Sequence, residues 1–290
     1  MIASITQRLF AAAPRDTLYH YTTLTGLLGI VGSRELRASD IRYMNDSAEL
    51  RHTLDLLAAH VTQRIIAGVD DPELLNQLQD WLSHRILSSS LLMGASFRAN
   101  GNLLSQWRGY SVHGKGVSLG FDPAHILECA ERQAFQVGKC VYDPAEQAAL
   151  IEQIVDAVEA LAAVQAPDPD ARGAPSWRRV FEQIEGDLLR IAAVLKHPAF
   201  EEEQEWRLVS PLITRCLEHP VSFREGHSML VPYYAFDLGQ AEAGMQLEHV
   251  YLGPTNNIDL SMHSLRLYLQ SCGVTPARGI SYCQIPFRQR

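Results

Sequence analysis

The sequence predicts an α+β fold, in which a sheet of short strands is flanked by helices. Segments of strand type gather in groups instead of alternating regularly with helices, which disfavours a wound βαβ sheet. Hydrophobic residues make up 47% and charged residues 20% of the 290 residues. That composition is typical of a globular chain that can bury a sizeable core. We expect one domain over residues 1–290.

The first third of the chain predicts strands and helices in quick succession. "TLYHYT" at 17–22 is rich in aromatic and β-branched residues, which favour a strand. "LTGLLGIVGS" has apolar residues at helical spacing, with Gly32 as the expected C-cap. An amphipathic helix is expected within 1–16, and an extended segment at 35–46 that turns at Asn45. Further helices are expected at 47–68, with Ser47 as N-cap, and at 72–88 and 102–111. Strands are expected at 89–97 and 115–123, the last ended by Pro123.

The rest of the chain predicts a helical stretch followed by strands. Two helices, at 144–164 and 176–195, are separated by a Pro/Asp/Gly-rich loop at 165–175. We interpret 144–196 as a helical insert within the single domain. The other expected elements are strands at 135–143, 205–212, 228–238, 247–254 and 280–288, and a helix at 258–272.

The charge balance and the cysteines narrow the classes of function. A net charge of −8 gives the chain no overall attraction for nucleic acid or an anionic membrane. No apolar run reaches the roughly 18 residues of a membrane-spanning helix. The five cysteines form no CxxC pair, so a zinc site of the usual spacing is not expected. Their odd number and wide spacing favour reduced thiols in a cytoplasmic protein.

The familiar catalytic and phosphate-binding motifs are absent from the sequence. It contains no GxxxxGK[ST], no GxGxxG after a strand, no HExxH and no GxSxG. "GKGVSLG" has glycines and a lysine, but it lies within a strand pattern, where close backbone packing explains the glycines. Candidate site residues are therefore sought in segments whose polar groups look costly as pure structure.

The stretch Tyr19-His20-Tyr21-Thr22 is the first such candidate. Strand alternation places His20 and Thr22 on one face and the two tyrosines on the other. The polar face is suited to lining a cleft beside the glycine-rich segment that follows. The alternative is a core histidine that is hydrogen-bonded to the backbone.

The second candidate lies in "FEEEQEWRLV". Glu205 begins an apolar alternation, with Arg207 on its own face and Trp206 on the other. A carboxylate held beside an arginine stays ionised and can stabilise an electron-poor centre or bind a ribose hydroxyl. The alternative is a surface ion pair between Glu205 and Arg207, which would contribute little to stability.

A third group lies in "SFRANGNLLSQWRGYSVHGKG". Trp107 and Tyr110 are three residues apart and share a helix face, which fits packing in the core as well as a ligand. Arg98 or Arg108 is suited to binding a phosphate. The segment also supplies Ser96, Gln106 and His113.

Taken together, these segments resemble the domain of unknown function 2971 family of bacteria and phages. The resemblance rests on "LYHYTTLTGLLGIVGSRELRASDIRYMNDSAEL", "LLSQWRGYSVHGKGVSLGFD", "EEEQEWRLV", "VYLGP" and "ISYCQIPFR", in this order, between residues 17 and 288. The stretch 144–196 has no motif that matches.

A more distant resemblance is to the His–Tyr–Glu layout of ADP-ribosyltransferases. It implies a split antiparallel sheet that holds NAD as substrate in a cleft, with His20 and Glu205 as catalytic residues. His20 would hold ribose hydroxyls, and Glu205 would stabilise the cationic sugar. The stacking aromatic would be Tyr110, Trp107 or Tyr43, and no metal is needed. The further NAD-binding candidates are Tyr19, Tyr21, Thr22, Asn45, Ser96 and Arg207.

Three functions follow as hypotheses. The first is an NAD-consuming ADP-ribosyltransferase, in keeping with a toxin or defence effector, whose acceptor is a protein, a small molecule or nucleic acid. The second is a non-catalytic module that binds a nucleotide or a partner, in which Glu205 is paired with a cation and lines no cleft. The third is a nuclease or phosphodiesterase that uses His20, His113 and an arginine. Apolar surface helices are compatible with a homodimer.

Overall fold

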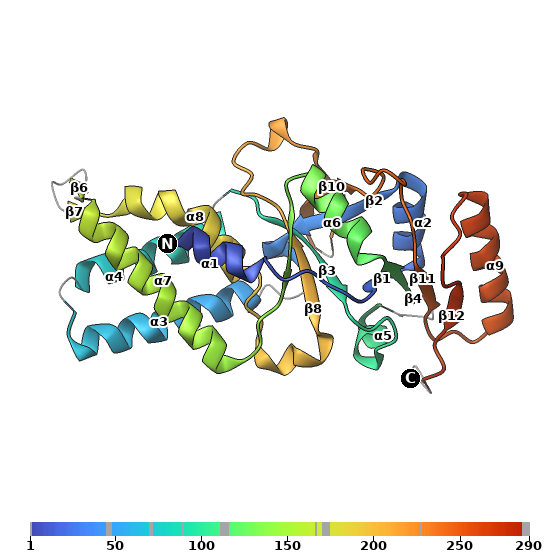
Figure 1. Cartoon of the computed structure of the whole chain (residues 1–290), viewed down its shortest axis with the longest axis horizontal. Helices are drawn as coiled ribbons and strands as arrows, with labels where there is room; N and C mark the ends of the chain where they lie inside the picture. The colour runs from blue at the N-terminus through green and yellow to red at the C-terminus, as the bar shows by residue number, and fades with distance from the viewer. Residues whose placement is uncertain are drawn as a thin grey trace.

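The computed structural model consists of a large, mostly antiparallel sheet on one side and a bundle of helices on the other (Figure 1). The structure describes residues 2–44, 48–69, 72–88, 90–110, 116–165, 167–169, 175–226 and 228–285. In the view of Figure 1 the bundle lies on the left and α9 on the far right. The mixed α and β content agrees with the predicted class.

Ten strands of the described residues form the sheet. Their order is β12-β11-β4-β1-β3-β2-β10-β9, and β8 pairs with both β3 and β5. β11 and β12 are parallel, and the other pairs are antiparallel. The strands are β1 (Leu18–Thr23), β2 (Glu35–Asp40), β3 (Met93–Arg98), β4 (Gly116–Phe121), β5 (Gln136–Lys139), β8 (Glu205–Val209), β9 (Val221–Glu225), β10 (Leu230–Asp237), β11 (His249–Leu252) and β12 (Ile280–Tyr282).

The helices divide between the bundle and the sheet. Those of the bundle share one apolar core around Val155, Phe181 and Leu78. They are α1 (Ile2–Leu9), α3 (Ala48–Ala67), α4 (Pro72–Ser88), α7 (Pro144–Val164) and α8 (Arg178–Ala192). The helices beside the sheet are α2 (Leu24–Ser33), α5 (Leu104–Tyr110), α6 (Pro123–Arg132) and α9 (Ile258–Ser271). The helical stretch 144–196 therefore packs with α1, α3 and α4, which the sequence analysis did not group with it.

The edge of β3 that faces β1 and β2 is paired only at its two ends. β1 meets it at one position, where Tyr19 lies opposite Arg98. β2 meets it at the other end, where Ser39 and Asp40 lie opposite Gly94 and Met93. The opposite edge of β3 is paired with β8 from Gly94 to Arg98. β1 and β2 thus diverge over the middle of β3, and α2 connects them.

Most of the predicted elements are present, with shorter strands than expected. Strand 135–143 is reduced to β5, and strand 205–212 to β8. The C-cap of α2 is Arg34, with φ 59°, so the expectation that Gly32 ends this helix was wrong. Asn45 and Ser47 lie outside the described residues.

Several elements were missed by the sequence analysis. α6 begins at Pro123, with Asp122 as N-cap, although the proline was interpreted only as a strand end. Proline is favoured at the first helical position, so Asp122-Pro123 was a usable start pattern. The edge strand β9 and the 3₁₀ helix η3 (Pro198–Glu203) were also missed, as was the small ribbon of β6 (Asp168–Pro169) and β7 (Pro175–Ser176).

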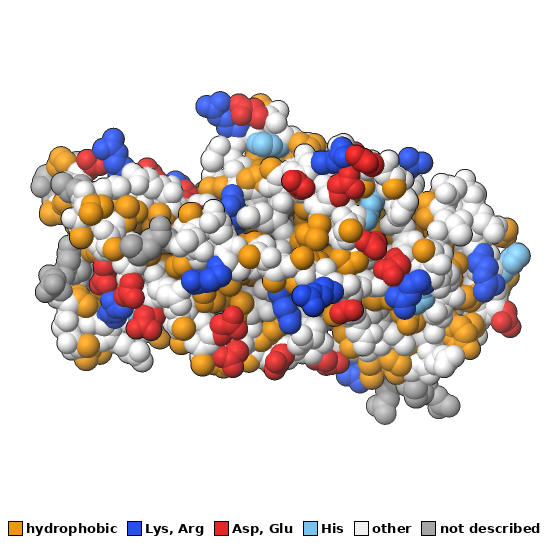
Figure 2. All heavy atoms as spheres, viewed as in Figure 1, with side chains coloured by type: hydrophobic (Ala, Val, Ile, Leu, Met, Phe, Trp, Pro, Cys, Tyr) orange, Lys and Arg blue, Asp and Glu red, His pale blue; other side chains and the backbone are white. Residues whose placement is uncertain are grey.

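Two features concern membranes and nucleic acid: the lengths of the helices and the distribution of charged side chains on the surface. Among the described residues, none of the helices has the length and apolar character needed to cross a membrane. On the face shown in Figure 2, basic and acidic side chains are interspersed and do not form one basic patch. An extended nucleic-acid surface is therefore not found on this face.

The packing of β1 against β4 depends on a glycine. A Cβ added to Gly120 would lie 2.8 Å from the Tyr19 ring, 2.9 Å from the Thr17 methyl and 3.0 Å from the His249 carbonyl oxygen. We expect Gly120→Ala to lower the free energy of unfolding by about 1–3 kcal/mol, because overpacking of a full core strains its neighbours. Urea unfolding measures this change.

Gly186→Ala is the matched control. This glycine lies within α8, and its nearest neighbour would be 3.9 Å from an added Cβ. The helix should gain about 0.5–1 kcal/mol from the exchange. Equal shifts of both variants in the same direction would contradict the packing described for β4.

Candidate functional site

A cavity of about 760 Å³ lies where β1 and β2 diverge over β3. Its size falls within the range of roughly 300–1,000 Å³ that is typical of small-molecule sites. β1, α2, β2, β3, α5, β9 and β10 all contribute residues to its lining. The polar and aromatic members of the lining are His20, Tyr21, Thr22, Thr23, Thr25, Ser33, Glu35, Arg37, Ser39, Tyr43, Ser96, Arg98, Gln106, Tyr110, Arg224 and Tyr233.

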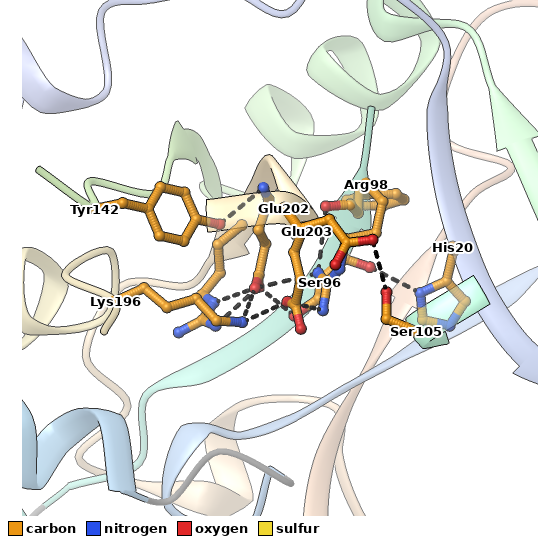
Figure 3. A network of polar contacts seen from close by, with 11 residues as sticks. His20, Ser96, Arg98, Ser105, Tyr142, Lys196, Glu202 and Glu203 are labelled. Atoms are coloured by element: carbon orange, nitrogen blue, oxygen red, sulfur yellow. Dashed lines mark hydrogen bonds and ion pairs between the residues drawn. The ribbon is translucent and has the colours of Figure 1, made fainter. Parts of the chain in front are cut away.

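His20 lines this cavity and is hydrogen-bonded to β3, which forms the cavity floor. Its Nδ1 is 3.0 Å from the carbonyl oxygen of Ser96, at the unpaired middle of the β3 edge (Figure 3). A backbone carbonyl at that position needs a partner, and the imidazole N–H supplies one in place of a neighbouring strand. This hydrogen bond places the proton on Nδ1 and leaves the lone pair of Nε2 for a ligand.

Burial lowers the pKa of His20, and nearby Arg98 lowers it further, while the bond to Ser96 opposes the shift. The imidazole is therefore neutral at pH 7. A neutral His20 adds no positive charge to the cavity, and its Nε2 is able to accept a hydrogen bond.

Glu205 lies at the first position of β8 and is fully buried. The chain enters the strand through Gln204, whose left-handed φ of 42° ends the 3₁₀ helix η3. Glu205 pairs with Arg98 across the strands, so their side chains share a face. Arg207, two residues along β8, points to the same face, whereas Trp206 packs against the main core. This alternation confirms the predicted faces.

The carboxylate of Glu205 is surrounded by cations, of which Figure 3 labels Arg98 and Lys196. Lys196 Nζ lies 2.6 Å from Oε2, and Arg98 Nη1 lies 3.1 Å from the same oxygen. Arg207 approaches Oε1 through Nη2 at 2.8 Å and through Nε at 2.9 Å. Ser96 Oγ donates to Oε1 at 2.5 Å. Burial alone raises the pKa of Glu205, but the three cations outweigh it and hold that pKa well below its usual range.

A second carboxylate joins the same network. Glu203 lies 2.7 Å from Arg98 Nη2 and 2.7 Å from Lys196 Nζ. The cluster of Arg98, Lys196, Glu203, Glu205 and Arg207 thus contains three cations and two carboxylates, one positive charge in excess. We call it the buried charge cluster.

The buried charge cluster joins the sheet to the helical bundle. Arg207 Nη1 donates to the carbonyl oxygen of Ala193, just after α8, at 2.7 Å. Lys196 follows that helix in the chain and is itself fully buried. Tyr142 is uncharged, and its hydroxyl accepts a hydrogen bond from the Glu205 backbone N–H at 3.0 Å. Removal of the Glu205 carboxylate would therefore leave unpaired cations at the contact between the sheet and the helical bundle.

Glu205 does not line the cavity, whereas two of its partners do. Ser96 and Arg98 are lining residues on the β3 floor. Arg207, a predicted NAD-binding residue, is also buried away from the lining. Glu205 consequently acts on the cavity through Ser96 and Arg98, whose side chains it orients.

The tyrosines of β1 face the other side of the strand. Tyr19 and Tyr21 belong to an aromatic cluster with Trp107, whose ring centroid lies 4.9 Å from that of Tyr21. The Trp107 indole N–H donates to Asn102 at 2.8 Å, and the ring is fully buried. Neither Tyr19 nor Trp107 lines the cavity, so the structure does not bring these two predicted residues to a ligand there.

The structure places some of the remaining predicted residues in the cavity lining and does not describe others. Thr22, Tyr43 and Tyr110 line the cavity, and Tyr21 contributes to the lining although its hydroxyl donates to the Asn100 carbonyl oxygen. Asn45 and His113 lie outside the described residues. No group of three His, Cys, Asp or Glu side chains in the described part of the chain is arranged to hold a metal ion.

The sequence analysis missed polar residues of β2, β9 and β10 in the lining. Arg37 and Ser39 alternate with Leu36 and Ala38, which are buried on the opposite face. This period of two was visible in the sequence and would have placed Arg37 and Ser39 on one polar face. Lys196 carried no such pattern, because it stands alone in an apolar segment.

The tautomer of His20 is a testable consequence of its contacts. Because burial lowers the pKa of His20, we expect the ring to be neutral, with the proton on Nδ1, at pH 7 and above. The stability contributed by the neutral ring is present above the ordinary histidine pKa of about 6.5 and is lost as the pH falls below it. Nitrogen NMR of labelled histidine measures both. A His20 ring that becomes protonated at or above the ordinary histidine pKa of about 6.5 would contradict the assignment.

The buried charge cluster predicts a large effect at Glu205. Glu205→Gln leaves three buried cations facing one carboxylate, so we expect a loss of roughly 3–5 kcal/mol in the free energy of unfolding at pH 7. Because the pKa of Glu205 is lowered, its contribution is present above the ordinary glutamate pKa of about 4.3 and is lost as the pH falls below it. Urea unfolding from pH 7 to pH 3 measures this, and the difference between the two proteins should shrink below about pH 4.3 without closing by pH 3.

Glu201→Gln is the control for this substitution. Glu201 is exposed in the same run of glutamates, and its loss should change stability by less than about 0.5 kcal/mol. A Glu205→Gln protein as stable as the Glu201→Gln protein at pH 7 would contradict the cluster.

The comparisons with known proteins agree with part of the sequence interpretation. No curated protein matches the chain. The family model described as "Protein of unknown function (DUF2971)" matches residues 106–208. The match includes 144–196, where the sequence analysis found no motif of this family. It also includes Lys196, Glu205 and Arg207, whereas His20 lies outside it. Over residues 106–208, the resemblance to the family of unknown function 2971 is confirmed.

Proposed function

We propose that this protein binds a nucleotide in the cavity over β3, and that NAD is the ligand to test first. The observation that carries the proposal is the lining itself. It combines a hydrogen-bond acceptor at His20, hydroxyls of Thr22 and Ser96, and an arginine at Arg98. A nucleotide presents ribose hydroxyls, phosphates and a flat base, and these groups match the three kinds of side chain.

Aromatic and charged side chains support the same ligand class. Tyr43, Tyr110 and Tyr233 all contribute to the lining, so a base has aromatic rings to contact. Arg98 is held by two carboxylates, and the buried charge cluster as a whole has an excess positive charge beneath the floor. In an acidic chain, such local positive charge favours an anionic ligand in the cavity.

Binding without catalysis is the form that this geometry supports best. A transferase of the His–Tyr–Glu layout needs its carboxylate beside the reacting sugar. Here the Glu205 carboxylate is buried and occupied by three cations, as the hypothesis of a binding module requires.

ADP-ribose transfer is the second candidate, and one observation favours it. Ser96 lines the cavity and donates to Glu205, so the carboxylate lies one hydrogen bond behind the floor. Transfer would require Glu205 to leave its cations. The acceptor, whether a protein, a small molecule or nucleic acid, belongs to this second candidate alone.

Calorimetric titration with NAD tests the proposal. We expect saturable binding to the wild-type protein and about tenfold weaker binding to His20→Ala, because a buried hydrogen bond to the ligand is lost. Released nicotinamide is measured on the same samples; binding without release supports the module, and release supports transfer.

His263→Ala is the control for the histidine substitution. This histidine is exposed on α9, and it does not line the cavity. Its affinity for NAD should equal that of the wild type. Thermal unfolding of both variants separates a loss of affinity from a loss of fold. Failure of NAD, ATP and ADP-ribose to bind to a folded wild-type protein would refute the proposal.

A further inference from the structure

One end of the cavity is formed by a face of the β2-β10-β9 part of the sheet. Ser39 lies opposite Tyr233, and Arg37 lies opposite the next residue of that face, Ala235. Arg224 of β9 lies opposite Val231, which is two residues from Tyr233 and on its side of the strand. The register therefore places two arginines, a serine and a tyrosine on one face.

The two arginines converge on this face from different strands. The guanidinium carbon of Arg37 lies 5.2 Å from the centroid of the Tyr233 ring. Arg224 Nη2 lies 3.4 Å from Ser39 Oγ, and Nη1 lies 3.5 Å from the Glu225 carbonyl oxygen. Both side chains thus flank the Tyr233–Ser39 row.

Neither Arg37 nor Arg224 forms an ion pair with a carboxylate of the described residues. Glu35 also lines the cavity, but it is not paired with either arginine. Elsewhere in the lining, Arg98 is bound by Glu203 and Glu205, and Arg42 of the neighbouring turn is paired with Asp40. The two arginines of this face are therefore left with positive charge that a ligand can neutralise.

We propose that Arg37, Arg224, Ser39 and Tyr233 form an anion subsite that binds the phosphates of the ligand. The guanidinium groups supply paired N–H donors for phosphate oxygens, the Ser39 hydroxyl supplies a further donor, and the Tyr233 ring holds Arg37 in place. This inference rests on the proposed nucleotide function and specifies it. The ligand is a nucleotide with two linked phosphates, whose sugar lies at the His20 end.

Matched ligands test the subsite. NAD carries two phosphates, whereas nicotinamide riboside has a sugar and base of NAD but no phosphate. We expect Arg37→Ala and Arg224→Ala each to weaken NAD binding by about tenfold or more and to leave nicotinamide riboside binding unchanged. Inorganic pyrophosphate, titrated alone, should lose affinity in the same two variants.

Arg179→Ala is the control for lost positive charge. Arg179 is exposed at the start of α8, in the helical bundle, and its side chain faces Asp168. Its removal should leave all three affinities unchanged. Thermal unfolding confirms that each variant is folded.

The outcomes separate the two proposals. If NAD and nicotinamide riboside both bind but both arginine variants weaken them equally, or weaken neither, the subsite is refuted and nucleotide binding stands. If no nucleotide binds, but pyrophosphate does and loses affinity in both variants, the subsite stands and nucleotide binding is refuted. Selective weakening of NAD and pyrophosphate supports both.

Discussion

The ion pairs of Glu205 are the interaction on which the site depends. A fully buried carboxylate is costly unless cations and hydrogen bonds satisfy it, and here Lys196, Arg98 and Arg207 all do so. These three cations come from the end of the helical bundle, from β3 and from β8. One carboxylate therefore fixes the position of the bundle relative to the sheet and the orientation of Arg98 in the cavity. Its value to the molecule is this fixed geometry, since buried ion pairs contribute little net stability over apolar packing.

The cavity arises from a second constraint, the incomplete pairing of β3. A strand edge inside a protein must satisfy its carbonyl and N–H groups, and β1 and β2 do so only at the two ends of β3. In between, the imidazole of His20 accounts for the Ser96 carbonyl oxygen. The unpaired middle of the β3 edge therefore both requires the histidine as a hydrogen-bond partner and leaves the space that forms the cavity. Ser96 connects both constraints, because its carbonyl binds His20 and its hydroxyl binds Glu205.

Local patterns in the sequence predicted much of the fold and part of the site. Period-two alternation placed His20 away from Tyr19 and Glu205 beside Arg207, since strand geometry alone decides these faces. Lys196 could not be found in this way. It stands in an apolar segment after a helix, and only the contact between the bundle and β8 gives it a partner. Whether Glu205 faces a ligand or a cation was likewise undecidable from β8, because Arg98 comes from another strand.

The burial of Glu205 changes which residues a ligand can meet. In the His–Tyr–Glu layout that the sequence analysis considered, the Glu205 carboxylate would contact the sugar. Here the carboxylate is neutralised within the protein, and the lining presents His20, Arg98, Arg37 and Arg224 instead. The lining has three arginines, one carboxylate at Glu35 and a neutral histidine, so it carries net positive charge and is suited to holding an anion in its ground state. Stabilisation of a positive charge that develops on the sugar would require a negatively charged group at the cavity wall. This charge distribution supports the proposal that the cavity recognises a phosphate-bearing ligand and does not cleave its glycosidic bond.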